Sequence, residues 1–570
     1  MVSLIEYRPY KLQNYLSNIP ELVQEYMCDK NIKKSDINKY LFPTYENLYC
    51  WKNLDGLEMA VQLTLEHLEN GNTILIYGDY DTDGVTATTI GYKCLNVIAP
   101  LTGSKILYKL PNRKEGYGMH INVLKTIIST YSVDLIITVD NGIKNVAEIK
   151  YLRDNNIDVI VLDHHQPEMS NLPNANVIVD LHMPNTSYPF KHLAGCGLAF
   201  KFACGIFDSI GLGISRAYEY LELATIGTIA DCVDLLDENR TIVKLGLKSM
   251  NQNPSPAIKE LLKFLKLYGQ INSATIAYGI SPCINAPGRL STPDVSFSLL
   301  NCSEDDCTIY AEKVFSYNKK RKELEKFYFE EAEKYINSIQ NDKIFIIHLP
   351  DCEDGIIGLI ADKITEIYNK PSIVFCGTGE ILKGSCRSIE ELDMHNLLSS
   401  ISKIIMKYGG HEMAAGLSIE SKKLRAFKQA LLEKVDPLLS FNTAAKRISV
   451  FGKVNIEEVH ILRKNLDLLE PFGQKNEAPI FETSYILSPN KNHKYFNFIG
   501  SPEAAHLVLY NKYYEFILFD GVKRYNQLGY PLFMNILFTP VYKTFNTITK
   551  IQLQGIEIID NSSYYFKECI

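Results

Sequence analysis

Three predicted strands in the first half of the chain each run directly into one or more carboxylates. The strands are largely apolar runs at 73–77, 134–139 and 158–162. The acids that follow them are Asp79, Asp81 and Asp83 after the first strand, Asp140 after the second and Asp163 after the third. Because the ligand crevice of an open parallel sheet lies beyond the carboxyl ends of its strands, we expect these acids to meet in one crevice.

So many carboxylates in one crevice indicate a site for a cation. Unpaired carboxylates repel one another strongly at low dielectric, and a bound divalent cation removes that repulsion. Aspartate oxygens together with the imidazoles of His164 and His165 suit Mn²⁺ or Mg²⁺ better than a thiolate-bound zinc. The acids are numerous enough for two ions about 3.5–4 Å apart, the arrangement used in phosphoryl hydrolysis.

A single aspartate after a strand is usually a turn residue or a helix N-cap, so one such acid is a weak indication. The succession of DxDxD, DNG and DHH after consecutive strands is hard to explain in that way. Asp231, at the end of the apolar segment ELATIGTIAD, is a further candidate ligand. We expect Gly84 and Gly142 to permit sharp turns just after the acids.

The surrounding pattern predicts an α/β fold that holds these acids on a parallel sheet. A fourth short strand is predicted at 177–179, and segments of helical length separate the strands. A helical zone covers about 192–270, and a long charged helix at 303–340 is expected to bridge two lobes. A second α/β region follows at 344–439. Residues 1–70 are expected to be mostly helical, and the last 130 residues have the short alternating runs of a small all-β domain.

Composition sets the class of protein. The chain has 570 residues, 46% of them hydrophobic and 22% charged, with a net charge of 59 − 66 = −7. This balance excludes a disordered or collagen-like chain, and it excludes a protein that coats nucleic acid by bulk positive charge. The 13 scattered cysteines are expected to be reduced. With no signal-peptide pattern and no apolar run of membrane length, we expect a cytoplasmic protein.

Several motifs together resemble one known family. They are GDYDTDGVTAT, VDNG, LDHHQP, TIGTIADCVDL, INAPGRL, KGSCRSI, GGHEMAAGLSI and LEPFGQKNEAPIF, in that order. They resemble the DHH phosphoesterase superfamily and, within it, the RecJ family of single-strand-specific 5′→3′ exonucleases. The resemblance implies an N-terminal helical segment (1–50), a DHH domain (51–300), a connecting helix (301–340), a DHH-associated α/β domain (341–440) and a C-terminal OB-fold β-barrel that binds single strands (441–570).

The resemblance also implies roles for the acidic cluster. The expected ligands of two divalent cations, Mn²⁺ or Mg²⁺, are Asp81, Asp83, Asp140, His164 and Asp231. Asp79 and Asp163 are expected to orient those ligands, and His165 to contact the scissile phosphate. Hydrolysis of the phosphodiester then needs no covalent enzyme intermediate.

A second group of residues matches family positions that handle the end of the strand. Arg113, Arg289, Ser385 and Arg387 correspond to the positions that hold the terminal 5′ phosphate, and guanidinium groups suit phosphate oxygens. Gly409, Gly410 and His411 are expected to approach the nucleotide closely. The implied activity is release of 5′ mononucleotides from single-stranded DNA in repair and recombination. The implied setting is a nucleoid-associated monomer that works with a single-strand-binding protein and a helicase.

Two alternatives stay open at this point. The chain could be a DHH enzyme that acts on short oligonucleotides, or a DHH-fold scaffold that binds DNA without cleaving it. Two departures from the family pattern bear on affinity and on the choice between DNA and RNA. Cys283 stands where these sequences usually carry arginine, and Glu353 stands where they usually carry histidine.

Overall fold

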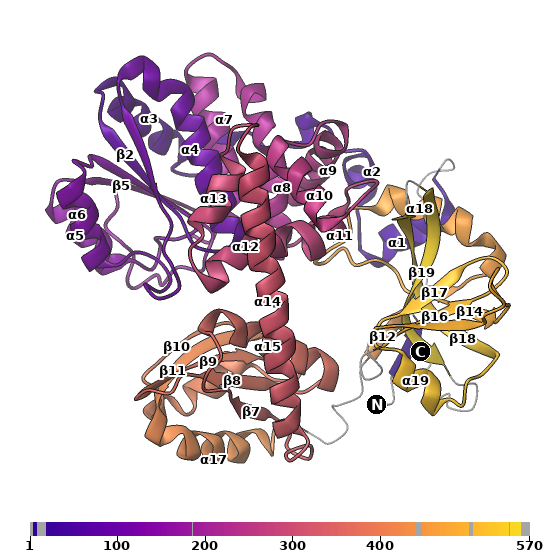
Figure 1. Ribbon diagram of the computed structural model, residues 1–570. Coiled ribbons are helices and arrows are strands. Elements are labelled where there is room, and N and C mark those ends of the chain that lie inside the picture. Colours follow the sequence, from indigo (N-terminus) through magenta and orange to yellow (C-terminus); the bar gives the residue numbers. More distant parts are fainter. Residues whose placement is uncertain are drawn as a thin grey trace.

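The chain folds into three lobes, two of which are joined by one long helix (Figure 1). The computed structural model describes residues 4–7, 19–184, 186–439, 447–500, 505–545 and 548–559. The end of the predicted C-terminal domain, 560–570, and the boundary at 440/441 lie outside these residues. Among the described residues no helix is long and apolar enough to cross a membrane.

The first lobe is built on a five-stranded parallel sheet, which confirms the predicted α/β class. In spatial order the strands are β3 (Lys105–Lys109), β2 (Thr73–Tyr77), β4 (Leu135–Val139), β5 (Asp158–Asp163) and β6 (Val177–Asp180). Tyr77 is in register with Thr138, and Val139 with Leu162, so the carboxyl ends of the three central strands lie level. The sequence pattern did not predict β3, an edge strand that begins and ends with lysine.

Helices cover both faces of this sheet. On one face, Ile74, Ile76 and Ile137 pack in a large core with α4 (Thr82–Thr102), α7 (Gly195–Ser209) and α8 (Leu221–Ala230). On the other face, Leu75 and Ile136 pack against α5 (Ile121–Thr130) and α6 (Val146–Asp154). Continuous apolar strands are typical of sheets that are buried in this way on both faces. The remaining helices of the lobe are α3 (Leu57–Glu69), α9 (Asp237–Gln252), α10 (Pro256–Leu265), α11 (Ser273–Thr275), α12 (Ser281–Leu290) and α13 (Asp294–Leu300).

The long helix α14 (Cys307–Ile336) joins the first lobe to the second (Figure 1). Near its start, Ala311 and Val314 belong to the core of the first lobe. Near its end, Phe329, Ala332 and Ile336 belong to a core of the second lobe. The prediction of a charged helix that bridges two lobes is therefore confirmed.

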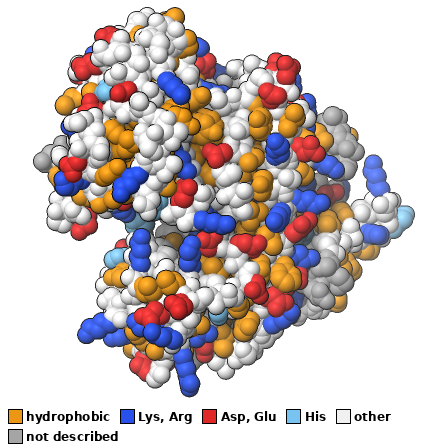
Figure 2. Space-filling view, turned by 60° about the vertical axis from the view of Figure 1, so that its left-hand side comes forward, with side chains coloured by type: hydrophobic (Ala, Val, Ile, Leu, Met, Phe, Trp, Pro, Cys, Tyr) orange, Lys and Arg blue, Asp and Glu red, His pale blue; other side chains and the backbone are white. Residues whose placement is uncertain are grey.

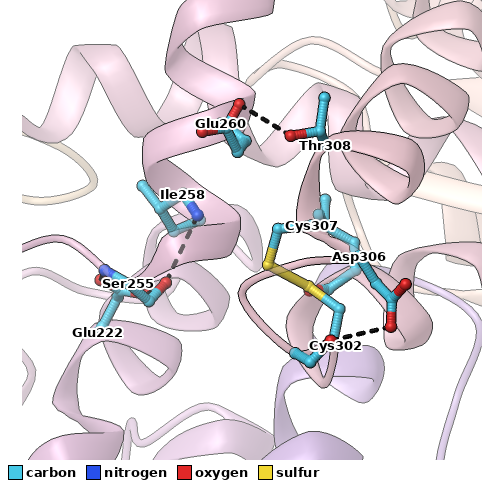
Figure 3. The surroundings of a disulfide bond; sticks show 10 residues. Glu222, Ser255, Ile258, Glu260, Cys302, Asp306, Cys307 and Thr308 are labelled. Carbon is cyan, nitrogen blue, oxygen red and sulfur yellow. Dashed lines mark hydrogen bonds between the residues drawn. A yellow bond between two sulfur atoms is a disulfide. The ribbon is translucent and has the colours of Figure 1, made fainter.

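A disulfide closes the loop that leads into this helix. Cys302 and Cys307 are bonded across the turn between α13 and α14 (Figure 3). The expectation that all cysteines are reduced is wrong for this pair, because the loop brings their Cα atoms to 5.6 Å, within disulfide range. The other ten cysteines of the described residues are free, and seven of them are buried.

The second lobe is a mixed five-stranded sheet. Its order is β10 (Lys407–Gly410), β11 (Ala414–Glu420), β9 (Ile381–Arg387), β8 (Ser372–Cys376) and β7 (Phe345–His348). Strands β7 and β8 are parallel and the other pairs are antiparallel. Helix α17 (Leu424–Val435) packs with α16 (Met394–Ser399) in one core, while α15 (Asp354–Tyr368) packs with the end of α14 in another.

The third lobe holds a seven-stranded mixed sheet. Its order is β13 (Gly452–Lys453), β14 (Phe481–Ile486), β18 (Phe533–Phe545), β19 (Ile548–Ile559), β17 (Glu515–Leu518), β16 (His506–Tyr510) and β15 (Phe496–Ile499). Helices α18 (Val459–Leu469) and α19 (Val522–Gln527) add to the strands, so the expectation of an all-β domain is incomplete.

The N-terminal segment completes this third lobe. Helices α1 (Glu21–Asp29) and α2 (Ile37–Leu41) place Tyr26 and Tyr40 in the same core as the C-terminal sheet. Strand β1 (Leu4–Tyr7) pairs in parallel with β12 (Arg447–Val450), so this segment, which we expect to be mostly helical, also contains a strand. The N-terminal helices and the C-terminal sheet therefore fold together.

A buried arginine connects this lobe to the first. Arg240 of α9 is 1% exposed, lies 3.9 Å from the centre of the Tyr40 ring, and donates to the carbonyl oxygens of Tyr40 at 2.8 Å and Glu470 at 3.0 Å. Asn476 accepts a hydrogen bond from the Tyr40 hydroxyl at 2.6 Å and donates to the carbonyl of Pro471 at 2.8 Å. The motif LEPFGQKNEAPIF thus forms a joint between α2, α9 and the C-terminal sheet.

We predict that Arg240→Ala destabilises the protein. The substitution leaves buried carbonyl groups without a donor, so the free energy of unfolding should fall by about 3 kcal/mol or more. The measurement is a urea titration followed by circular dichroism. Arg216→Ala is the control, because Arg216 is exposed, where it pairs with Glu219 and lies 5.9 Å from the centre of the Phe207 ring. Equal effects of the two substitutions would contradict the role given to the joint.

Candidate metal centre and phosphate cavity

The acids that follow the strands do meet at one place. Asp79, Asp83, Asp140 and Asp163 are each at most 3% exposed. His164 Nε2 lies 3.0 Å from Asp140 Oδ1 and 3.8 Å from carboxylate oxygens of both Asp83 and Asp231. Asp231 reaches the cluster from the C-terminal end of α8. Residues from four separate segments therefore face one another.

Helix α7 positions one of these carboxylates. The backbone N–H groups of Gly195 and Cys196, at the start of α7, donate to the two oxygens of Asp83 at 2.7 and 2.9 Å. A helix N-terminus favours a negative charge at this position. Glycine allows the close approach, because a Cβ on Gly195 would lie 2.5 Å from Asp140 Cβ and one on Gly227 would lie 2.7 Å from Asp83 Oδ1.

The backbone around the first and second strands is held tightly. Asp140 has a φ of +59°, a left-handed conformation that aspartate tolerates better than most residues. Gly142, with a φ of +116°, makes the turn that we expected there. Gly84 does not have a positive φ; it lies in the first turn of α4, where a Cβ would lie 2.6 Å from the Asp79 carbonyl oxygen. Close packing, rather than a turn, is what calls for glycine at position 84.

Asp163 supports the two histidines that follow it. Its carboxylate accepts from the backbone N–H groups of Ile143 and His164 at 2.9 and 2.8 Å, and from His165 Nδ1 at 2.7 Å. Burial lowers the pKa of His165, but the hydrogen bond and charge of Asp163 outweigh it and raise that pKa to about 9. Burial and the charge of His165 lower the pKa of His164 to about 3. These surroundings favour a neutral imidazole at His164, the form that binds a metal, and a protonated one at His165.

The cluster has the properties expected of a cation site. Burial and the neighbouring carboxylates raise the pKa values of Asp79, Asp140 and Asp231 well above normal, and that of Asp83 to about 6. Asp79 Oδ1 is buried and has no hydrogen-bond partner. These carboxylates are thus arranged so that they cannot all be charged without a cation. The donor set of carboxylate oxygens and imidazole suits Mn²⁺ or Mg²⁺.

Three overlapping groups of three residues could each hold a metal ion. Within each group, one ligand atom from each residue lies within 4.8 Å of the other two. The groups are Asp79–Asp81–Asp140, Asp83–His164–Asp231 and Asp140–His164–His165. All five predicted ligands belong to at least one group. Asp79 and His165, which we expected only to assist, also have atoms at ligand distance from the others. Overlapping groups of this kind have room for two neighbouring ions.

The predicted phosphate-binding arginines come from three separate segments and lie close together. Arg113 stacks on the Tyr80 ring, 4.4 Å from its centre, and its Nε is buried without a hydrogen-bond partner. Arg289 donates to the Gly355 carbonyl at 3.1 Å. Burial, with the positive charges of Arg113, Arg321 and Arg387 around it, lowers the pKa of Arg289 to about 10. A bound anion would offset the repulsion between these guanidinium groups, so the cluster is suited to phosphate.

A cavity of about 350 Å³ lies beside this arginine cluster, between the first and second lobes. Tyr80 and Arg113 line it from the first lobe, and α15, β9, β10 and β11 line it from the second. Figure 2 shows a hollow between the two lobes with basic and histidine side chains along it. Of the residues expected to hold the strand end, Arg113, Ser385 and Gly409 line the cavity, whereas Arg289, Arg387, Gly410 and His411 lie outside its lining.

The two departures from the family pattern are not among the residues that line this cavity. Cys283 is buried beneath α14, where its Sγ accepts a hydrogen bond from Asn318 Nδ2 at 2.8 Å. Glu353 is exposed at the start of α15. Burial raises the pKa of Tyr328 on α14, and the charge of Glu353 raises it further. The neighbouring Asp354, not Glu353, lines the cavity.

Comparison with known proteins agrees with this arrangement. Three family models match in order: the DHH family N-terminal domain at 73–228, the DHHA1 domain at 341–436 and the RecJ OB domain at 451–557. The single-stranded-DNA-specific exonuclease RecJ of Haemophilus influenzae is 31% identical over 523 residues, which cover 86% of this chain and 89% of that protein. The chain belongs to the RecJ family.

Two further relatives extend the comparison. The Escherichia coli RecJ is 29% identical over 495 residues, which cover 83% of this chain and 84% of that protein. The crystal structure of RecJ from Thermus thermophilus in complex with Mn²⁺ covers 98% of this chain and 80% of its own, with a TM-score of 0.81 at 22% identity. The RecJ fold therefore extends over the whole described chain, including the C-terminal lobe.

Some residues of the site were not predicted from the sequence. The Tyr117 hydroxyl donates to the Asp140 carbonyl oxygen at 3.2 Å and lies 3.1 Å from His165 Nδ1. Tyr117 lies in the segment LPNRKEGYG (110–118), but a single tyrosine in a loop gives no signal of its own. The sequence does contain an indication of the N–H groups that hold Asp83. The glycines in AGCG precede a helical run and permit close approach of the backbone.

We predict that Gly195→Ala weakens metal binding without unfolding the protein. The added methyl group would displace Asp140 or the start of α7, so the affinity for Mn²⁺ should fall by about 10- to 100-fold. Isothermal titration calorimetry with MnCl₂ measures this effect. Gly379→Ala is the control, because a Cβ there meets nothing within 4 Å. Unchanged Mn²⁺ affinity in Gly195→Ala would contradict the geometry described here.

Proposed function

We propose that this chain is an exonuclease specific for single-stranded DNA that depends on Mn²⁺ or Mg²⁺. The observation that carries the proposal is the buried carboxylate–histidine cluster beside a cavity with an arginine cluster. One group suits divalent cations and the other suits phosphate, and both lie where the first and second lobes meet. The relatives that match this chain over most of its length bear the name of that activity.

The residues that would hold the cations are Asp81, Asp83, Asp140, His164 and Asp231. When bound, the cations supply Lewis-acid activation of the phosphodiester and of the attacking water. Asp163 fixes both histidines through its hydrogen bonds, and α7 fixes Asp83. His165 is held as a cation beside the cluster, where it can stabilise negative charge on the scissile phosphate. Asp79 would orient these ligands.

The strand end would be held on the other side of the scissile bond. Arg113, Arg289, Ser385 and Arg387 would bind the terminal 5′ phosphate, with Gly409, Gly410 and His411 beside the terminal nucleotide. Arg387 Nη1 already donates to Ser385 Oγ at 3.3 Å, so both can face one phosphate. An anchored 5′ end next to the cluster would give 5′→3′ polarity and mononucleotide products.

The C-terminal lobe would bind the strand beyond the cleavage site. OB-folds hold single strands by stacking aromatic side chains along a positive groove. In this role the protein would act as a monomer at the nucleoid, in repair and recombination. A helicase would supply the single strand, and a single-strand-binding protein would deliver it.

The two alternatives have less support. A non-catalytic scaffold has no need of five ligand residues at ligand distance, all of which this chain carries. An enzyme restricted to short oligonucleotides has no need of a third lobe that shares its core with the N-terminal segment.

We predict that Asp140→Ala abolishes cleavage. Asp140 belongs to two of the three groups of ligand atoms, so the rate of mononucleotide release in Mn²⁺ should fall by about a thousandfold or more. Release from a uniformly labelled single strand measures the rate, and circular dichroism verifies the fold. Asp154→Ala, on the exposed face of α6, is the control. Full activity of Asp140→Ala would exclude the proposed site.

A further inference from the structure

The cavity extends beyond the residues proposed to hold the terminal phosphate. On the face of the second-lobe sheet that lines it, side chains form rows across β9, β11 and β10. Register places Ser385 opposite Gly416, and Gly416 opposite Gly409; we call these three residues the inner row. Two residues further along each strand, Lys383 lies opposite Ser418, and Ser418 opposite Lys407. We call this second set the outer row, and it lies about 7 Å from the inner row at the usual strand rise.

Two of the three inner-row positions lack a side chain, and the protein itself gives no reason for these glycines. A Cβ on Gly409 would meet nothing within 4 Å, and one on Gly416 would meet only the Gly384 carbonyl oxygen at 3.9 Å. Neither glycine has a positive φ. Gly410 differs, because its φ is +144° and a Cβ would lie 2.4 Å from the Ala414 carbonyl oxygen. The two glycines of the inner row therefore keep space open for a ligand that lies flat on the sheet.

The outer row is at the end of the cavity away from the metal centre. His411 and Arg387 continue the rows in the other direction, since the His411 N–H donates to the Ala414 carbonyl and Ala414 lies opposite Arg387. Burial lowers the pKa of His411, and Lys144 and His165 of the first lobe are close enough for their charges to lower it further. A strand whose first phosphodiester lies at the metal centre would place its 5′ phosphate over the inner row. Any further phosphate attached to that 5′ phosphate would then lie over the outer row.

We propose that the outer row binds the second and third phosphates of a 5′-triphosphate end, so that this chain degrades strands that carry one. The inference rests on the proposed function and names the substrate class of the same site. Lys383, Lys407 and Ser418 supply two ammonium groups and a hydroxyl to phosphate oxygens, and Arg113 lines the same cavity.

The reaction breaks the same bond as on a monophosphate end. Water adds to the phosphorus of the first phosphodiester, the bond from phosphorus to the 3′ oxygen of the first nucleotide breaks, and that oxygen takes the proton. The products are a nucleoside 5′-triphosphate with a free 3′ hydroxyl and a strand shortened by one nucleotide with a 5′ monophosphate. No oxidant, reductant or further reactant is needed.

One carboxylate opposes this ligand and provides a test. Asp354 lines the cavity and accepts from Lys383 Nζ at 2.7 Å, with both side chains partly exposed. Ion pairs of such exposure are weak, so a polyphosphate can draw Lys383 away from Asp354. Removing the Asp354 charge should therefore favour the triphosphate, whereas removing Lys383 or Lys407 should disfavour it. These opposite effects separate charge recognition from a general loss of structure.

The experiment compares single strands of one sequence that bear a 5′ hydroxyl, monophosphate or triphosphate, each labelled at the 3′ end. We measure kcat/KM for the first cleavage by the full chain in Mn²⁺ and identify the first product by chromatography. Wild type should release nucleoside triphosphate. The ratio of kcat/KM on triphosphate to that on monophosphate should fall about tenfold in Lys407→Ala and Lys383→Ala and rise in Asp354→Asn, as expected for one charged contact. Lys422→Ala, an exposed lysine of the same lobe, should keep the wild-type ratio.

Two results would overturn the inference and leave the proposed function intact. One is rapid cleavage of the monophosphate strand with no cleavage of the triphosphate strand by wild type. The other is an unchanged ratio in both lysine variants. Failure to cleave any of the three strands would instead overturn the proposed function itself.

Discussion

Mutual repulsion of buried carboxylates is the constraint on which the rest of the structure depends. Asp79, Asp83 and Asp140 are almost fully buried, and their burial and the charges of neighbouring carboxylates raise their pKa values. Such a cluster is stable only where other groups hold it in place and a cation neutralises it. The level carboxyl ends of β2, β4 and β5, the N-terminus of α7 and the hydrogen bonds of Asp163 are the groups that hold it.

The second and third lobes are arranged around this fixed centre. Helix α14 shares residues with the cores of both the first and second lobes, so it connects the two walls of the cavity. Arg240 and the 470–476 loop tie the third lobe to α9 of the first. Because the N-terminal helices share the core of the C-terminal sheet, the third lobe cannot be removed at residue 441 without exposing that core.

The sequence was informative where local pattern and burial coincide. Strands β2, β4, β5 and β6 are apolar runs buried on both faces, so the sheet could be predicted. Aspartates stand at or just after the carboxyl ends of these strands, so the cluster at the edge of the sheet could be predicted as well. Strand β3 could not, because an edge strand with terminal lysines has no continuous apolar run. Strand β1 pairs with β12 more than 400 residues away, and no local signal indicates such a pairing.

The same distinction applies within the site. Asp81, Asp83, Asp140, His164 and Asp231 stand out by type and spacing. The groups that orient them do not, because backbone N–H groups of Gly195 and Cys196 and the hydroxyl of Tyr117 act through tertiary position alone. The rows of the second-lobe sheet also depend on strand register. Gly409 was predicted from its motif, whereas Gly416 and Lys383 become visible only when the strands are aligned.

The most direct test of the central claim is digestion of a single-stranded DNA that carries its label at the 3′ end, with and without Mn²⁺. The account predicts labelled fragments that shorten progressively from the 5′ end, only when Mn²⁺ is present, and no cleavage of the matching duplex. Intact labelled strand in Mn²⁺, although the protein binds it, would contradict the account. Early release of the labelled 3′ nucleotide would contradict the proposed polarity.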